Sequence, residues 1–286
     1  MDAVTDELNR EVIFGRMIGL VTEAELADLS SATIAVPGCG GVGFTHAETL
    51  IRMGVGGVNI SDFDTFGPEN FNRQFGATVH TLGKSKALVL EGRLKSINPM
   101  LRTMIFDGVR RENLERFLDA VDIVCDAMDY FVIEPRILMY RKAREKNIPV
   151  VVSGPIGFGA TLQIFDPNGM SFEEYYNLSD DQTEEDKLLK FGIGLNPGKL
   201  HRSYLDDPKL NFETRKVASL SSSCLLCSSL VGAFTIGKLL KRKTFFRPVP
   251  YVYQIDLMTG TFVEQYIPGG VKSLEANEPI MKVRSL

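Results

Sequence analysis

A glycine-rich loop opens the part of the sequence that could do chemistry. Gly38, Gly40, Gly41 and Gly43 fit the pattern G-x-G-x-x-G, which lets backbone N–H groups approach a phosphate at a helix N-terminus. Asp62 follows about 20 residues later, at the expected end of the next strand, where its carboxylate can accept hydrogen bonds from ribose hydroxyls. These five residues predict a nucleotide site, and by themselves they are typical of a dinucleotide used in hydride transfer.

Polar and cationic residues beyond Asp62 change this interpretation. Asn70, Arg73 and Gln74 lie within twelve residues of Asp62, and Lys86 lies on the next expected helix. Arginine and lysine behind a ribose-binding acid suit a triphosphate, because they can neutralise charge that grows on a transferring phosphate. A dinucleotide pyrophosphate is normally satisfied by the loop and the helix end. The two cations therefore favour ATP over a nicotinamide cofactor.

Two further aspartates complete the predicted site. Asp129 is expected to end the fourth strand, in the sequence DAMD, at the carboxyl edge of the sheet where ligands of open α/β sheets bind. A carboxylate there can hold Mg²⁺ against the phosphates of a nucleotide. Asp64 lies two residues beyond Asp62 at the same edge, so it joins the predicted nucleotide-binding residues.

Strands and helices alternate along the chain up to about residue 167. Apolar runs predict strands, and the segments between them carry helical patterns with turn signals at their ends. This alternation predicts an α/β fold with a doubly wound, Rossmann-like sheet. The expected strands are 32–38, 57–64, 101–108, 121–129 and 148–157, and the expected helices are 43–54, 83–99, 111–120 and 135–147.

The remaining segments predict one domain over residues 1–286, with a parallel core and antiparallel C-terminal strands. We expect N-terminal helices in 1–30, the nucleotide-binding core in 31–167, a crossover excursion in 168–223, a helix and two strands in 224–267, and a loose tail in 268–286. The acidic stretch 171–186 is either a solvated loop or a partner surface. The possible anchors of such a surface are Tyr175, Tyr176, Phe191 and Tyr204.

Composition limits the classes of partner. The net charge of −4 and the pI of about 5.6 argue against a broad nucleic-acid surface. The cysteines at 39, 125, 224 and 227 are too few and scattered for a secreted disulfide framework. The longest apolar stretch, 224–237, is short of the roughly 20 residues that span a membrane, and it predicts a buried helix. With no signal peptide visible at the start, we expect a cytoplasmic protein that does not bind membranes.

Seven motifs in unbroken order connect the sequence with a known family. They are GCGGVG, SDFDTF, NFNRQ, GKSKA, INP, DAMD and VVSGPIGFGATLQIF, within residues 9–166. With them the chain resembles the ThiF/MoeB/HesA family, which is related to ubiquitin-activating enzymes. The resemblance implies an ATP-dependent adenylyltransferase, in which a substrate carboxylate attacks the α-phosphate of ATP and pyrophosphate leaves. The acceptor would be the C-terminus of a small ubiquitin-like or sulfur-carrier protein, or a peptide.

The resemblance also assigns roles to residues. It implies that Asp62 holds the ribose, that Asn70, Arg73 and Lys86 act on the phosphates, and that Asp129 binds Mg²⁺. Arg10, in LNREVIF, resembles an arginine that reaches into the ATP site of a partner subunit. The resemblance therefore implies a homodimer.

The cysteines depart from the pattern of many relatives. Those relatives bind zinc with two C-x-x-C pairs, whereas this chain has only Cys224 and Cys227, with His201 as the only downstream histidine. Because structural zinc takes four ligands, we expect no zinc and interpret both cysteines as small buried residues opening a packed helix. A reactive thiol is the alternative. Residues 130–223 contain no cysteine, which excludes a thioester intermediate within that segment.

Three alternatives to an adenylyltransferase that acts on a carrier protein or peptide stay open. Adenylation of a carboxylate on a modified tRNA or on a small molecule would use the same site. A nicotinamide-dependent oxidoreductase is disfavoured by Arg73 and Lys86. A catalytically silent subunit that only docks a ubiquitin-like protein is disfavoured by the complete set of charged site residues.

Overall fold

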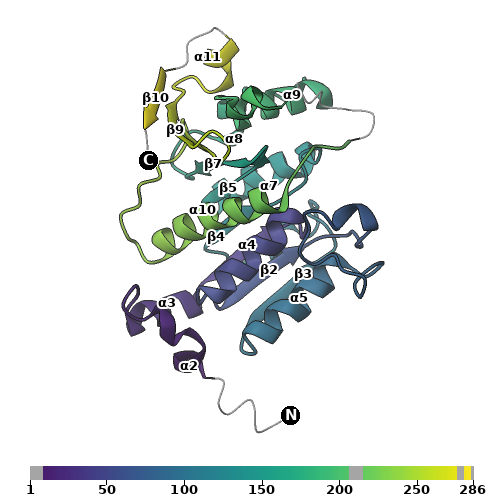
Figure 1. The fold of residues 1–286 in the computed structure, drawn as a ribbon, viewed down its shortest axis with the longest axis vertical. Coiled ribbons are helices and arrows are strands. Elements are labelled where there is room, and N and C mark those ends of the chain that lie inside the picture. The colour runs from purple at the N-terminus through teal and green to yellow at the C-terminus, as the bar shows by residue number, and fades with distance from the viewer. Residues whose placement is uncertain (1–8, 206–214, 276–279, 285–286) are drawn as a thin grey trace.

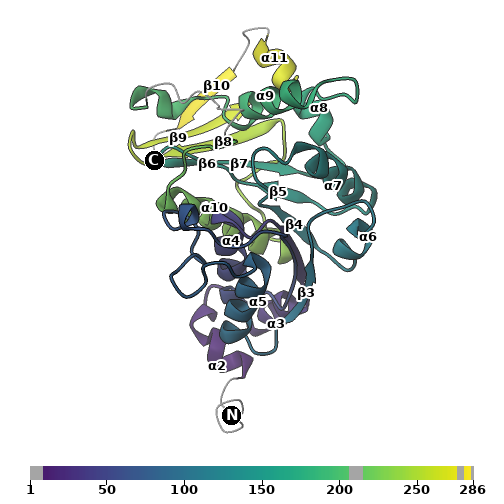
Figure 2. The same cartoon turned by 90° about the vertical axis from the view of Figure 1, so that its right-hand side faces the viewer.

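The computed structural model describes residues 9–205, 215–275 and 280–284. Within them a ten-stranded sheet has the order β10-β9-β8-β7-β5-β4-β1-β2-β3, with β6 beside β7 (Figure 1). Helices cover both faces of the sheet (Figure 2). The strands are β1 Thr33–Pro37, β2 Gly57–Ser61, β3 Arg102–Phe106, β4 Ile123–Asp126, β5 Val150–Val152, β6 Pro155–Ile156, β7 Gly159–Phe165, β8 Tyr251–Asp256, β9 Thr261–Tyr266 and β10 Ile280–Arg284.

The first half of the sheet is parallel and doubly wound. Ile34 in β1 pairs with Val58 in β2 on one side and with Ile123 in β4 on the other. The strand order therefore reverses between β1 and β4, and the loops that follow these two strands flank a crevice at the carboxyl edge. This confirms the predicted Rossmann-like core. Its connecting helices are α4 Gly41–Arg52, α5 Lys86–Ile97, α6 Leu114–Phe117 and α7 Ile133–Glu145.

The second half of the sheet is antiparallel, as the sequence predicted for the C-terminal strands. β7 runs antiparallel to both β5 and β8, and β8 and β9 form a hairpin. Several predicted boundaries were wrong. β2 ends at Ser61 rather than at residue 64, and the strand expected over 148–157 is divided into β5 and β6. The helix expected over 111–120 is the short α6, and the fourth strand ends at Asp126 rather than at Asp129. The strand stops there because the Asp126 carboxylate accepts a hydrogen bond from the Met128 N–H, which starts a turn.

The described part of the crossover excursion, up to residue 205, packs two helices on the core, which corrects the expected solvated loop, and residues 206–214 lie outside the described residues. Helices α8 (Phe172–Tyr176) and α9 (Glu184–Leu195) cover the face that also carries α7. Tyr175 and Tyr176 are completely buried and Phe191 is nearly so, with ring centroids of Tyr176 and Phe191 5.0 Å apart. Tyr204 is half-buried and donates a hydrogen bond to Asp256. Apolar ring area outweighed the acidic composition, because the acidic side chains of α8 and α9 are not buried.

The tail is also more ordered than the sequence predicted. Residues 271–275 form α11 (Val271–Glu275), and β10 pairs antiparallel with β9. Val271 is fully buried in the same cluster as α8 and α9. The expected loose segment 268–286 therefore includes the helix α11 and the strand β10, and β10 extends the sheet.

The N-terminal helices pack at the amino edge of the sheet, as expected from the sequence. They are α2 (Arg10–Phe14), a single turn η1 (Gly15–Met17) and α3 (Glu23–Ser31). Thr22 caps α3 in a reciprocal capping box with Glu25. The Gly56 N–H bonds to the Leu29 carbonyl, which fixes α3 beside the start of β2.

Helix α10 (Ser221–Leu239) is the predicted buried helix. It is long and apolar enough to cross a membrane, but it packs along α4 and over β7 as a core helix. A polar cluster joins it to α4, since His46 Nδ1 and Ser228 Oγ lie 2.7 Å apart and Ser228 Oγ donates to Thr45. The Nε2 atom of His46 is buried and has no hydrogen-bond partner among the described residues.

Burial of His46 predicts a pH-dependent stability. Burial lowers the pKa of His46 to about 3, so between pH 6.5 and 3 only the unfolded chain binds this proton. The stabilisation is complete above pH 6.5, and acid should lower the free energy of unfolding by up to about 1.4 kcal/mol per pH unit. Urea titrations between pH 5 and 7 measure this slope. His46→Gln, which does not titrate, should flatten it, and an unchanged slope would rule out His46 as its source.

Candidate nucleotide-binding site

The glycine loop packs against two neighbouring strand ends. Gly38 has a φ of +97°, its N–H donates to the Ser61 carbonyl at 2.7 Å, and a Cβ at this position would lie 2.3 Å from the Ala127 carbonyl oxygen. A Cβ on Gly43 would lie 1.9 Å from the Gly38 carbonyl oxygen. These glycines are needed first for the close approach of backbone to backbone. That approach fixes the N-terminus of α4 at the carboxyl edge.

The next part of the loop faces an amide side chain. A Cβ on Gly40 would have only the Gln74 amide within 4 Å, at 3.6 Å. Gln74 is buried, and its Oε1 atom has no hydrogen-bond partner in the part of the chain that the structure describes. A buried acceptor of this kind needs a donor from water or a ligand. Gly41 packs instead against Cys224 of α10, where an added Cβ would lie 2.9 Å from Sγ.

Asp62 fastens the glycine loop to the end of β2. Its Oδ2 accepts from the Cys39 N–H at 2.6 Å and its Oδ1 from the Asp64 N–H at 2.8 Å. Burial raises the pKa of Asp62, and these two hydrogen bonds and the Lys86 charge oppose that rise. The carboxylate is therefore held at the edge of the loop, where the predicted ribose-binding acid must lie.

Lys86 forms an ion pair with Asp64 within the predicted site. Its Nζ lies 3.0 Å from Asp64 Oδ2, and its side chain is 8% exposed whereas that of Asp64 is 52% exposed. The positive charge lowers the pKa of both Asp62 and Cys39 against the larger effect of burial, so it lies close to the glycine loop. Asp64, which was predicted to bind the nucleotide, pairs with Lys86 in the structure.

Arg73 is held by a short turn beside the loop. Asn70 ends the turn η2 (Pro68–Asn70), accepts from the Gly67 N–H at 3.0 Å, and its carbonyl accepts from the Gln74 N–H. Arg73 donates to the Glu69 carbonyl at 3.1 Å and to Asn72 Oδ1 at 3.0 Å. It forms no ion pair with any described carboxylate, so its guanidinium charge is available to an anion.

Asp129 lies on the loop after β4. The loop contacts the glycine loop through Ala127, and the Asp129 side chain is exposed, with Oδ1 accepting from the Phe131 N–H at 3.0 Å. Residues 9–205, 215–275 and 280–284 contain no group of three or more His, Cys, Asp or Glu side chains that could hold a metal by themselves. One exposed carboxylate fits Mg²⁺, which keeps several waters and takes further ligands from phosphates.

A buried ion pair that the sequence analysis missed holds this loop. Arg136 Nε lies 2.8 Å from Asp126 Oδ2, and both side chains are almost completely buried. The same guanidinium donates to the carbonyls of Met128 and Asp129, at 2.6 and 3.2 Å, and lies over the Phe191 ring. The signal in the sequence was an acid within the apolar run VDIVCD, which requires a buried cation on a neighbouring element.

Arg10 is the one predicted site residue that the structure places elsewhere. It begins α2, which lies beside α3 near the N-terminus, away from the loops after β1, β2 and β4 (Figure 1). Since α3 packs at the amino edge of the sheet, Arg10 cannot reach the glycine loop of its own chain. The other predicted residues gather at the carboxyl edge.

The cysteines are all free and buried. Cys224 and Cys227 lie in the first two turns of α10, which confirms their interpretation as small residues opening a packed helix. Burial raises the pKa of Cys224, and the nearby Arg73 charge only partly opposes this. A thiol held in its protonated form is a poor nucleophile, which argues against the alternative of a reactive cysteine.

Comparison with known sequences gives a family match over most of the chain. The model of the ThiF family matches residues 14–269. The chain is 36% identical over 158 residues to the tRNA threonylcarbamoyladenosine dehydratase of Haemophilus influenzae, covering 54% of this chain and 60% of that protein. It is 33% identical over 136 residues to the sulfur carrier protein adenylyltransferase of Thermus thermophilus, covering 47% of each. These matches span about half to three fifths of the relatives' length.

Solved structures share the fold at low sequence identity. PaaA has a TM-score of 0.67 at 19% identity and covers 90% of this chain and 82% of its own. Escherichia coli MccB with MccA-N7isoASN has a TM-score of 0.65 at 18% identity, covering 92% and 73%. E. coli tRNA N6-threonylcarbamoyladenosine dehydratase in complex with ATP has a TM-score of 0.60 at 21% identity, covering 81% and 95%.

Proposed function

The chain belongs to the ThiF family, and from this premise we propose that it uses ATP to adenylate a carboxylate. The observation that carries the proposal is the guanidinium of Arg73, which has no ion-pair partner among the described residues. It lies beside the glycine loop, and Asp62 and the buried Lys86 lie at the same loop. The pyrophosphate of NAD is satisfied by a glycine loop and a helix N-terminus, so an additional unpaired cation favours a nucleotide with a reacting phosphate. Sequence relatives that include a sulfur carrier protein adenylyltransferase, and an ATP complex among proteins of the same fold, support the same chemistry.

The reaction needs positioning and charge stabilisation. A substrate carboxylate oxygen attacks the α-phosphorus of ATP, the new P–O bond forms, and the bond to the β-phosphate breaks so that pyrophosphate leaves. In this proposal Asp62 binds the ribose, Arg73 and Lys86 stabilise the charge that develops on the phosphates, and Gln74 Oε1 accepts a donor from the nucleotide. Asp129 would hold Mg²⁺, which would supply neutralising charge between the phosphates.

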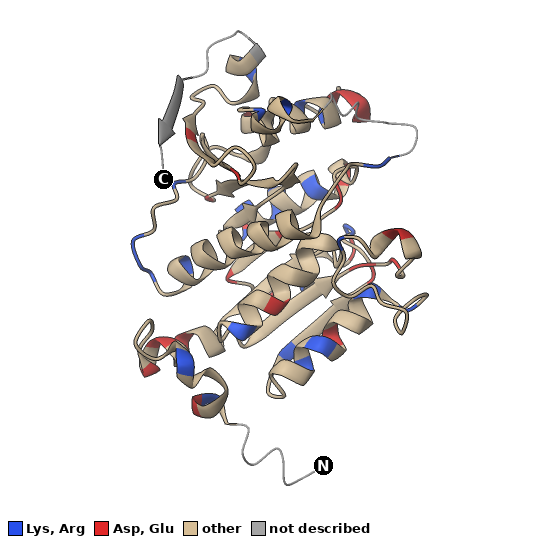
Figure 3. Cartoon of the chain, in the orientation of Figure 1, with Lys and Arg blue, Asp and Glu red and all other residues tan. Residues whose placement is uncertain are grey.

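We propose that the carboxylate belongs to the C-terminus of a small carrier protein or a peptide. Apolar side chains next to the site are exposed, which suits a protein partner: Phe71 is 43% and Phe75 46% exposed, close in sequence to Arg73. The Asn72 side chain donates to the Ser219 carbonyl, and the next residue, Leu220, which is the N-cap of α10, is 36% exposed. Figure 3 shows that basic and acidic residues are interspersed along the helices and loops.

A carboxylate on a modified tRNA is the second candidate. It is favoured by the three tRNA threonylcarbamoyladenosine dehydratases among the curated relatives, at 34–36% identity. The net charge of −4 and the mixed surface charge oppose it, because tRNA binding needs a basic surface.

The test is exchange of labelled pyrophosphate into ATP. The chain is incubated with ATP, Mg²⁺ and, in turn, carrier proteins that end in Gly-Gly, peptides with a free C-terminus, bulk tRNA and small acids. Exchange that depends on a carrier or peptide supports the first choice, and exchange that depends on tRNA selects the second. Exchange with none of them, together with tight NADH binding, would replace adenylation with oxidoreductase chemistry. ATP binding without exchange would favour a silent docking subunit.

We also propose that the chain works as a homodimer in a reducing, cytoplasmic compartment. All four cysteines are free thiols, which suits that compartment. The position of Arg10 at the amino edge supports the homodimer, because this arginine can act on a nucleotide only in a second copy.

Mixing two inactive variants tests the role of Arg10. Arg10→Ala and Asp129→Ala proteins, each inactive alone, should regain about a quarter of the wild-type exchange rate after subunit exchange, since each two-fold heterodimer has one intact site. The mixture is assayed for pyrophosphate exchange. Arg16→Ala, assayed alone, is the matched control and should keep the wild-type rate. If the mixture stays inactive while subunits demonstrably exchange, Arg10 does not act in the partner's site.

A further inference from the structure

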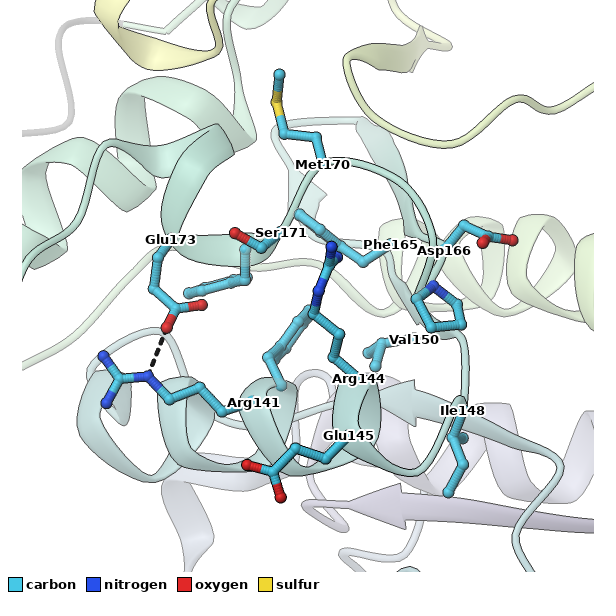
Figure 4. A pocket seen from close by; sticks show the side chains of 13 residues that line it. Arg141, Arg144, Glu145, Ile148, Val150, Phe165, Asp166, Met170, Ser171 and Glu173 are labelled. Atoms are coloured by element: carbon cyan, nitrogen blue, oxygen red, sulfur yellow. Dashed lines mark hydrogen bonds and ion pairs between the residues drawn. The ribbon is translucent and has the colours of Figure 1, made fainter.

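A cavity of about 540 Å³ lies away from the nucleotide site, between the C-terminal half of α7 and the turn that follows β7 (Figure 4). Val150 begins β5 and pairs with Phe165, which ends the antiparallel β7, so both lie at the amino edge of the sheet. The glycine loop and Asp129 are at the carboxyl edge. The cavity is therefore a separate feature, within the size range of small-molecule sites.

Apolar side chains form the floor of the cavity. Tyr140, Phe165 and Phe172 contact one another, with ring centroids 4.2 Å apart for Tyr140 and Phe172 and 5.1 Å apart for Tyr140 and Phe165. Ile148 and Val150 complete this floor. All five residues are at least nine-tenths buried, so the core preforms the floor, and an apolar ligand body would contact only the edges of these side chains that line the cavity.

Charged side chains at the rim are paired, with one exception. Glu173 pairs with Arg141, Glu145 with Lys142, and Asp166 with Lys238. Arg144 reaches across the cavity from α7 and donates from Nη1 to the Gly169 carbonyl at 2.8 Å (Figure 4). It forms no ion pair with any carboxylate in the described ranges. Each rim carboxylate thus has a cation within ion-pair distance, whereas Arg144 has none among the described carboxylates at that distance. Hydrogen bonds from Ser171 and, to a smaller extent, the Arg144 charge lower the pKa of Glu174, which does not line the cavity.

We propose that this cavity is a second ligand site, for a small monoanion with an apolar body such as a medium-chain or aromatic carboxylate. The anionic group pairs with the Arg144 guanidinium, whose remaining N–H donors can form a charge-assisted bidentate contact. The apolar body lies on the Tyr140, Phe165 and Phe172 floor. The proposal does not depend on adenylation, because none of these residues belongs to the nucleotide site.

A single tryptophan makes binding visible at this position. The chain has no tryptophan, so Met170→Trp on the cavity rim introduces a unique fluorescent reporter. Octanoate, well below its micelle concentration, should change the emission of this tryptophan saturably, and octanol should bind more weakly. Adding Arg144→Met should weaken octanoate binding by about tenfold or more, because a charge-assisted hydrogen bond is lost. Arg111→Met, which removes an exposed arginine away from the cavity, should leave binding unchanged.

Calorimetry with unlabelled octanoate guards against an effect of the reporter itself. The chain with Met170 intact should bind octanoate, and Arg144→Met alone should weaken this binding by a similar factor. Circular dichroism confirms that the variants are folded. Equal affinity of the original chain and Arg144→Met, equal affinity for octanoate and octanol, or no saturable binding in calorimetry would each overturn the proposal.

Discussion

Replacing Arg73 or Asp129 with alanine should lower the rate of ATP–pyrophosphate exchange by about a hundredfold to a thousandfold, the usual cost of removing one donor or charge aimed at a transition state. The fold should stay intact. Among the described residues, the Arg73 side chain donates only to the Glu69 carbonyl and to Asn72, and the exposed Asp129 side chain accepts one local N–H. Neither side chain is part of the buried core, so their loss removes charge from the site without opening a cavity.

The two substitutions should differ in what rescues them. Arg73→Lys retains a positive charge and should recover part of the lost rate, but not all, because an ammonium cannot make the bidentate contact of a guanidinium. Asp129→Ala should raise the Mg²⁺ concentration needed for half-maximal exchange, whereas Arg73→Ala should mainly lower the maximal rate. Exposed residues of the same types supply matched controls, Arg111→Ala and Asp119→Ala.

Kinetics and stability must be measured on the same preparations. Exchange rates at saturating ATP and thermal unfolding together separate a lost role in the site from a lost fold. Wild-type exchange in both folded variants would contradict the assignment of this edge as an adenylation site.

Arg136→Met should destabilise the chain by about 3–5 kcal/mol, because it leaves the buried Asp126 carboxylate without its partner. After the substitution, the Asp126 carboxylate keeps hydrogen bonds from the Tyr140 hydroxyl, 3.0 Å from Oδ2, and from the Met128 N–H. The substitution also removes the hydrogen bonds to the Met128 and Asp129 carbonyls, so the loop that carries Asp129 should loosen. Chemical denaturation measures the first effect.

A double substitution separates the two effects of Arg136. Removing both charges, in Asp126→Asn with Arg136→Met, should recover much of the stability, since no buried charge is left unpaired. It should not restore the low Mg²⁺ concentration needed for half-maximal exchange, because the loop that carries Asp129 still lacks the hydrogen bonds from Arg136. Arg116→Met, on an exposed helix position, is the matched control. If Arg136→Met costs less than about 1 kcal/mol, the buried pair does not hold this loop.

The sequence predicted the parallel core well because its signals are local. Apolar runs such as IAVP, followed by glycines and an amphipathic helix, indicate strand, loop and helix without knowledge of distant contacts. The carboxyl-edge position of Asp62 and the glycine loop follows from the same alternation. The buried helix α10 and the hairpin of β8 and β9 were predicted on similar grounds.

The excursion and the tail were mispredicted because their order depends on contacts between distant segments. Tyr175 and Tyr176 lie in an acidic stretch, and their burial follows only from packing against α9 and the sheet. β10 forms because β9 offers an open edge to pair with. In both places tertiary burial outweighed local composition.

The sequence by itself determined the type of site: glycines, acids and cations in the order that a nucleotide requires, at the ends of strands. The tertiary structure alone decided how the charges are shared. It paired Lys86 with Asp64, left Arg73 without a carboxylate partner among the described residues, and gave Asp126 rather than Asp129 the buried partner. The physical reason is that residue type and strand position are encoded locally, whereas burial and charge pairing depend on which side chains meet across the fold.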